Sequence, residues 1–102
     1  MTHGEKRRRF TFFLAKLIVY ANECGYGIAI DGTKEATGHI ENSFHPKGLA
    51  ADMNLYKGET WLKNTEDHRF LGDYWKSLDS MCTWGGDFKS PDGNHYSYGE
   101  GK

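Results

Sequence analysis

The sequence contains little cysteine and little proline, with two of each among 102 residues. Cys24 and Cys82 lie 58 residues apart and form no CxxC pair, which argues against a cysteine zinc site and against a disulfide scaffold. We expect two buried thiols, although a single disulfide between them stays open.

An excess of charge of one sign is also absent. The 13 lysines and arginines nearly balance the 14 aspartates and glutamates, which gives a formal net charge of −1. Because proteins that bind nucleic acid usually carry a basic excess, the composition gives no electrostatic case for such a partner. The length predicts a single domain over residues 1–102, and an aromatic content of 15% is too high for a disordered chain. We expect this domain to be a monomer.

No apolar run is long enough to span a membrane. The basic residues 6–9, followed by the mainly apolar residues 10–14, look like the start of a signal peptide. However, Lys16 interrupts the apolar run, and residues 21–23 do not form a cleavage site of small residues. We therefore expect a protein that is made in the cytoplasm without a secretion signal.

The first half of the chain predicts a helix, a short strand and a long loop. The helix runs from about Arg8 to Glu23, and Gly25 can end it in a left-handed conformation. Its apolar stripe consists of Phe10, Phe13, Leu14, Leu17, Ile18 and Ala21. Residues 27–30 predict a buried strand, and residues 31–46, rich in Gly, Thr, Asn and Ser, predict a loop.

The second half predicts two more strands and a second helix. Apolar and polar residues alternate over residues 49–55, which predicts a strand with Asp52 on its polar face. Residues 57–59 predict a turn, residues 65–78 a helix, and residues 95–98 a last short strand. The apolar stripe of that helix consists of Leu71, Tyr74, Trp75 and Leu78. This order predicts a small α+β domain with two main helices packed on a short, mainly antiparallel sheet.

Polar residues concentrate in two stretches where a core does not require them, residues 43–52 and 84–95. If their strands pair, His45, Asp52 and His95 converge on one point. Two imidazoles and one carboxylate leave the fourth coordination position of zinc open, which is typical of catalytic rather than structural zinc sites.

Asp92 precedes His95 by three residues, across a turn that contains glycine. A carboxylate there can take a proton from an attacking water. Spacing alone leaves other interpretations open, such as a capping aspartate with two polar histidines, or an iron site with two histidines and one carboxylate. Such iron sites normally have His-x-Asp, whereas Asp52 follows His45 by seven positions.

The two stretches together form a more specific pattern. Ser43-x-His45-x-x-Gly48-x-Ala50-x-Asp52, followed by Trp84-Gly85-Gly86-Asp87-Phe88 and Asp92-x-x-His95, resembles the zinc D-alanyl-D-alanine carboxypeptidase and L-alanyl-D-glutamate endopeptidase family, above all its small bacteriophage endolysins. The resemblance implies a hedgehog-like peptidase fold, a Zn²⁺ cofactor, the zinc ligands His45, Asp52 and His95, and the catalytic carboxylate Asp92.

The resemblance also implies a substrate, the peptidoglycan stem peptide, and action on the cell wall of the host in whose cytoplasm the protein is made. Asp92-x-x-His95, in place of Glu-x-x-His, is more similar to the phage endopeptidases. Residues 31–42 also lack the arginine that members commonly carry there and contain only Lys34. Both features favour cleavage between L-alanine and D-glutamate. The alternatives are a D-alanyl-D-alanine carboxypeptidase and a non-catalytic metal-binding module, and Asp92 argues against the latter.

Four residues are weaker candidates for substrate contacts: Ser43, Lys34, Trp84 and Asp87. Asp87 can instead shape the turn or position His95. Among the tryptophans, Trp84 is expected to border the site, and Trp61 and Trp75 to lie in the core or in a groove wall. The remaining histidines, at positions 3, 39 and 68, are expected to be structural.

Overall fold

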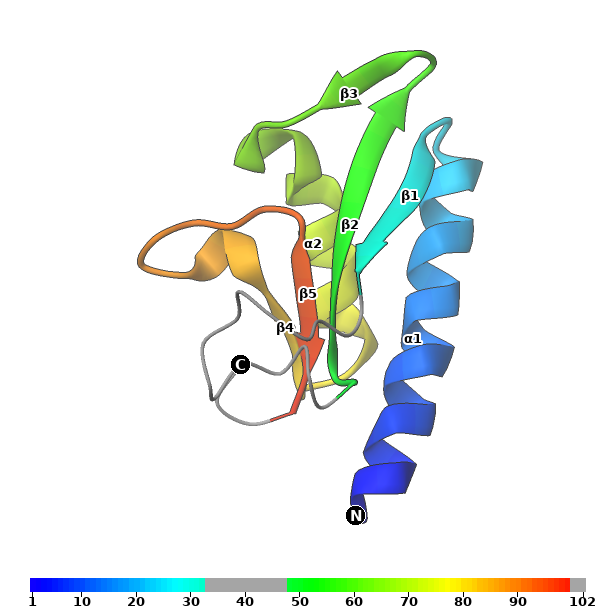
Figure 1. Ribbon diagram of the computed structural model, residues 1–102, viewed down its shortest axis with the longest axis vertical. Coiled ribbons are helices and arrows are strands. Elements are labelled where there is room, and N and C mark those ends of the chain that lie inside the picture. The colour runs from blue at the N-terminus through cyan, green and yellow to red at the C-terminus, as the bar shows by residue number, and fades with distance from the viewer. Residues whose placement is uncertain (33–47, 100–102) are drawn as a thin grey trace.

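Two helices and five strands make up the part of the chain that the computed structural model describes, residues 1–32 and 48–99 (Figure 1). In chain order they are α1 His3–Glu23, β1 Gly27–Gly32, β2 Ala50–Lys57, β3 Thr60–Leu62, α2 Arg69–Leu78, β4 Cys82–Trp84 and β5 His95–Tyr98. Two short 3-10 helices complete the set, η1 Thr65–His68 and η2 Gly85–Asp87. This architecture confirms the predicted small α+β domain.

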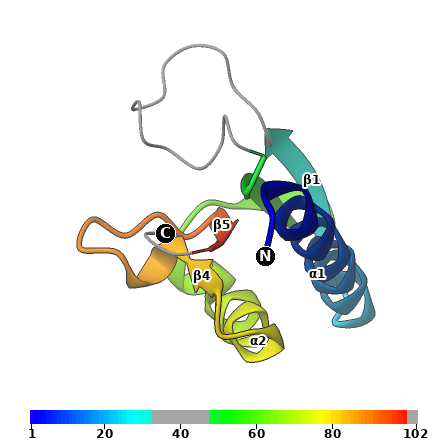
Figure 2. The ribbon, with the colours of Figure 1, turned by 90° about the horizontal axis from the view of Figure 1, so that it is seen from below.

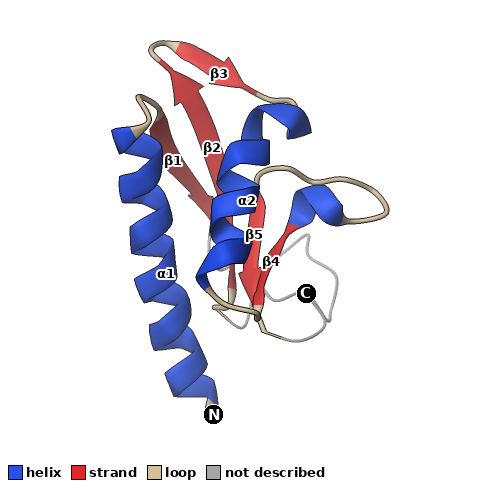
Figure 3. Ribbon diagram, turned by 180° about the vertical axis from the view of Figure 1, so that it is seen from behind, coloured by secondary structure: helices blue, strands red, loops and turns tan. Residues whose placement is uncertain are grey.

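The five strands form one antiparallel sheet (Figure 3). The strand order is β1-β2-β5-β4, and β3 pairs with β2 outside this path. Both helices lie on the same side of the strands, as Figure 2 shows. The sheet therefore has one face buried against the helices and a second face that is free to carry polar side chains.

The helix α1 begins five residues earlier than predicted because its start is a capping box. The Glu5 backbone N–H donates to Thr2 Oγ1 at 3.0 Å, and the Thr2 backbone N–H donates to Glu5 Oε1 at 2.7 Å. The basic residues 6–9 are consequently part of this helix. Gly25 has a φ of 93°, which confirms the left-handed conformation expected after the helix.

Alternation in β2 places its apolar side chains in the core, as predicted. Met53 and Leu55 are fully buried beneath the helices, whereas Asp52 and Asn54 are partly exposed on the other face. Ala50 departs from this pattern because it is fully buried although it shares the face of Asp52. The core side chains with at most 2% exposure include Phe10, Leu17, Ala51, Met53, Leu55, Leu71, Trp75, Trp84, Tyr96 and Tyr98.

The predicted helix over residues 65–78 is in fact two elements. Residues 65–68 form the 3-10 helix η1, and the α-helix begins only at Arg69. The stripe is otherwise confirmed: Leu71 and Trp75 are fully buried. The indole of Trp75 donates to the carbonyl oxygens of Thr83 and Ser97, so α2 is tied to both β4 and β5.

The sequence also predicted two buried cysteine thiols and no membrane-spanning segment. Both cysteines are free thiols, but only Cys82 is buried, so the expectation of a buried thiol is wrong for Cys24, which is exposed near the end of α1. Within residues 1–32 and 48–99, neither helix is long and apolar enough to cross a membrane.

Candidate active site

A cluster of two carboxylates and one imidazole lies on the sheet face opposite the helices. The antiparallel register pairs Asp52 of β2 directly with His95 of β5, and Asp92 lies in the turn that leads into β5. Metal-ligating atoms of the three side chains all lie within 4.8 Å of one another. The structure thus brings together three of the four residues that the sequence pattern selected for chemistry.

The donor set fits a zinc ion. Two ligands of a tetrahedral zinc at about 2.1 Å are about 3.4 Å apart, and His95 Nδ1 lies 3.7 Å from Asp52 Oδ1. His95 is buried, Asp52 is partly buried and Asp92 is exposed, so the cluster has a supported side and a side open to water. The remaining predicted ligand, His45, lies outside the described residues, as do Ser43 and Lys34.

The turn from Asp92 to His95 is held by backbone hydrogen bonds. The His95 N–H donates to the Asp92 carbonyl at 3.1 Å, and the Asp92 N–H donates to the Gly85 carbonyl at 2.9 Å. A Cβ at Gly85 would lie 2.2 Å from the Asp92 carbonyl oxygen and 2.7 Å from His95 Cβ. The glycine is therefore required because the turn that carries Asp92 and His95 passes directly over it.

We expect Gly85→Ala to displace this turn. The added methyl group must push backbone atoms aside, which should destabilise the fold by about 1–3 kcal/mol and misplace both side chains. Urea denaturation and turnover measure the two effects. Gly27→Ala is the matched control, because its Cβ would meet only Tyr56 Cβ, at 4.0 Å. Wild-type turnover in Gly85→Ala would contradict the role of the close approach.

Trp84 supports the same turn from the inside. Its side chain is fully buried, and its indole N–H donates to the Gly93 carbonyl at 2.7 Å. A side chain without exposed surface cannot contact a substrate, so the predicted substrate contact of Trp84 is corrected. Trp84 instead positions the turn that carries Asp92 and His95. That Trp84 borders the site stays a prediction.

Asp87 points away from the cluster toward α2. Its carboxylate accepts a hydrogen bond from Lys76 Nζ at 2.7 Å, which ties η2 to the last turn of α2. This ion pair favours the alternative in which Asp87 shapes the turn, and a contact with substrate stays a prediction. The next residue, Phe88, belongs to the quoted pattern but was given no role, and its ring packs on that of His95 with centroids 5.3 Å apart. Its position directly after the Gly-Gly-Asp segment is the sequence feature that could have indicated this contact.

A groove of about 280 Å³ opens beside Asp92 and reaches β3. It is lined by Asn54, Trp61, Leu62, Lys63, Thr65, His68, Pro91, Asp92, Gly93 and Asn94. Asn94 Nδ2 donates to Asn54 Oδ1 at 3.3 Å, and the Met53 N–H donates to the Asn94 carbonyl at 2.8 Å. These bonds extend the contact between β2 and the loop before β5 and form the floor of the groove. Trp61 is 50% exposed, which fits the groove wall expected for it.

His68 forms a buried contact at the edge of this groove. Its Nδ1 lies 2.9 Å from the hydroxyl oxygen of Tyr96, and only 2% of the residue is exposed. Burial penalises the charged imidazolium and lowers the pKa of His68 to about 4. His68 is therefore neutral at pH 7 and structural, as predicted.

The pKa of His68 predicts acid sensitivity. The unfolded chain takes up a proton near pH 6.5 and the folded chain only near pH 4, so stability is lost as pH falls between these values. The free energy of unfolding should drop by about 3 kcal/mol from this group between pH 7 and pH 4. In His68→Asn this contribution should disappear from urea denaturation curves recorded over that pH range. Equal pH slopes in both proteins would contradict the assignment.

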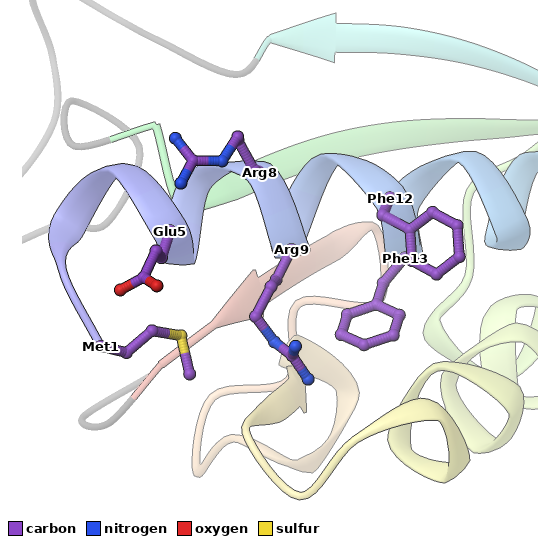
Figure 4. A pocket seen from close by; sticks show the side chains of 6 residues that line it. All are labelled: Met1, Glu5, Arg8, Arg9, Phe12 and Phe13. Carbon is purple, nitrogen blue, oxygen red and sulfur yellow. The ribbon is translucent and has the colours of Figure 1, made fainter.

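A larger cavity lies elsewhere, along the N-terminal half of α1. It measures about 730 Å³ and is lined by Met1, Glu5, Arg8, Arg9, Phe12 and Phe13 (Figure 4). Arg9 is already engaged, because Nε donates to the Tyr98 hydroxyl at 3.0 Å and a terminal nitrogen donates to Asp79 at 3.1 Å. Since this cavity contains none of the three clustered residues, size alone does not mark the site.

Comparison with known proteins identifies the family of the segment in which the cluster lies. A family model described as D-alanyl-D-alanine carboxypeptidase matches residues 36–98, well over half of the chain. The chain belongs to this family. The match to the D-alanyl-D-alanine carboxypeptidase family contains both polar stretches, residues 43–52 and 84–95, and leaves out α1. Members of the family are zinc-dependent peptidases, and the cluster on the sheet is a possible metal site of that kind. A search of curated proteins found no match.

Proposed function

We propose that this member of the D-alanyl-D-alanine carboxypeptidase family is a zinc-dependent peptidase that cleaves an amide bond in the peptidoglycan stem peptide. The observation that carries the proposal is the cluster of Asp52, Asp92 and His95, three residues selected by the sequence pattern that lie within the segment matched by the family model. His45, Asp52 and His95 would hold the metal. When bound, zinc supplies Lewis-acid polarisation of the scissile carbonyl and lowers the pKa of water to about 7.

The side chains have separate tasks in this proposal. Asp92 is the exposed member of the cluster, so its carboxylate can accept the proton of the attacking water and pass it to the leaving amine. His95 is buried between the Phe88 ring and Asp52, which fixes its orientation. The open side of the cluster leads into the groove, where a peptide can lie in extended form.

Cleavage between L-alanine and D-glutamate is the specificity we propose, in an endolysin-like protein that acts on the cell wall as a monomer and is made in the host cytoplasm. Aspartate at position 92 supports this choice. A carboxypeptidase recognises a terminal carboxylate, for which an arginine fork is the usual device. Arg9 is bound to Tyr98 and Asp79, so it is not available for that purpose.

A carboxypeptidase is the second candidate, and one contact favours it. The side chain of Arg7 lies against Gly48, with Nε 2.8 Å from the position of an added Cβ. An arginine thus reaches the segment that follows His45. Digestion of purified peptidoglycan with assignment of the new amino termini distinguishes the two. New D-glutamate amino termini are expected, and free D-alanine without them would reverse the choice in favour of the carboxypeptidase.

A further inference from the structure

The polar face of the sheet continues beyond the metal cluster. Asp52, Asn54 and Tyr56 alternate along β2 on that face, and the antiparallel register sets Trp61 of β3 opposite Tyr56. Paired residues in neighbouring strands project to the same side. Trp61 therefore stands on the same face as Asp52, at the far end of the groove that begins at Asp92.

Lys63 follows β3 and places a positive charge at that end. Its Nζ lies 5.2 Å from the centroid of the Trp61 ring, a cation–π contact that holds the ammonium group at the groove wall. Among the described residues that line the groove, Lys63 is the only cation at neutral pH, because burial keeps His68 neutral.

Two other cations near the site are already paired. Arg69 binds Glu66 at 2.7 Å, and Lys76 binds Asp87 at 2.7 Å. In residues 1–32 and 48–99, Lys63 takes part in none of the salt bridges. Its ammonium is thus available to an anion that enters the groove.

The positive charge of Lys63 lies away from the cluster. Asp92 lines one end of the groove, beside Asp52, and the ammonium of Lys63 lies at the other end. A zinc ion in the cluster would carry two positive charges, which offset the carboxylates of Asp52 and Asp92. The ammonium of Lys63 therefore attracts a peptide carboxylate to the far end of the groove, and this attraction favours one direction of an acidic peptide over the other.

We propose that Trp61 and Lys63 form a carboxylate-binding subsite that orients an acidic peptide substrate across the cluster. This inference rests on the proposed peptidase function. The ring of Trp61 provides a half-exposed apolar wall for the peptide, and Lys63 binds a free carboxylate of it. In a stem peptide that carboxylate belongs either to the glutamate residue or to the C-terminus, and the test separates these sources.

The test uses the zinc-loaded full chain and three synthetic stem peptides. One peptide has both carboxylates free, one carries an amide on the glutamate carboxylate, and one carries a C-terminal amide. We expect Lys63→Met to raise KM about 5- to 10-fold on the first peptide at unchanged kcat, and Lys63→Arg to restore most of the loss. On one of the two amidated peptides the variant and the wild type should have equal KM, which identifies the carboxylate that Lys63 binds.

Lys16→Met is the matched control, because Lys16 is exposed on α1 with its Nζ 4.9 Å from the centroid of the exposed Phe12 ring. It should leave KM unchanged on all three peptides. The subsite is overturned if Lys63→Met keeps the wild-type KM on the free peptide, or if its loss is the same on all three. Failure of the peptidase proposal is a different result, namely that the wild type cleaves none of the peptides.

Discussion

Asp92→Asn should lower turnover by about 10²–10⁴-fold while the protein keeps its zinc. The amide has nearly the shape of the carboxylate but cannot accept the proton of the attacking water. Asp92 is also the exposed member of the cluster, so its replacement should disturb the buried side of the site little. Turnover on purified peptidoglycan, together with zinc content by mass spectrometry, gives both quantities.

Asp73→Asn is the control for this variant. Asp73 is another exposed aspartate, and it lies on α2 with its Oδ1 3.9 Å from Lys76 Nζ. Its replacement removes an exposed ion pair, which is worth at most about 1 kcal/mol, so turnover should stay close to that of the wild type. If Asp92→Asn retains the turnover of this control, Asp92 is a turn residue without a catalytic role.

Replacing a predicted zinc ligand should remove the zinc itself, unlike Asp92→Asn, which should keep it. His95→Ala and His45→Ala should abolish stoichiometric zinc and, with it, hydrolysis. For His95 the structural reason is its direct pairing with Asp52, with 3.7 Å between Nδ1 and Oδ1. A two-ligand remnant does not hold zinc tightly, because protein zinc sites normally use at least three ligands.

His68→Asn controls for the general effect of replacing a buried histidine. His68 is as buried as His95 but contacts Tyr96 rather than the cluster. It should keep one zinc per chain. Circular dichroism of each variant separates loss of metal from loss of fold, since α1 and α2 give the helical signal. Full zinc content in both His45→Ala and His95→Ala would reject the ligand assignment.

The alternating pattern of residues 49–55 was sufficient to predict which face of β2 carries Asp52. Because the side-chain period of a strand is two, four buried apolar residues at odd positions fix the orientation of every residue between them. The last strand was also predicted with its observed bounds, His95–Tyr98. Asp52 lies next to His95 because β2 pairs with β5. The sequence analysis could state this pairing only as a condition, since the sole indication of it was the concentration of polar residues in the two stretches.

The parts that sequence patterns missed are short or depend on distant contacts. The strand β3 has three residues, too few for a period to be recognised, yet it carries Trp61 into the groove. The helical period over residues 65–78 could not show that the first turn is a 3-10 helix, because the two helix types differ little over four residues.

In the candidate site, too, the sequence predicted some features and missed others. Spacing and motif order selected Asp52, Asp92 and His95, which the structure gathers within 4.8 Å. They could not show that Trp84 lies under the turn and bonds to Gly93, or that Asp87 faces Lys76. Both facts depend on how α2 packs against β4 and η2, which is a tertiary arrangement that local sequence does not encode.

Digestion of purified peptidoglycan with and without a zinc chelator tests the central claim most directly. The zinc-loaded protein should release stem-peptide fragments with new amino termini, identified by mass spectrometry. Chelation should abolish the release, and added Zn²⁺ should restore it. Fragments that form equally in the presence of the chelator, or no fragments from a protein that holds one zinc per chain, would contradict the assignment of this chain as a zinc-dependent peptidoglycan peptidase.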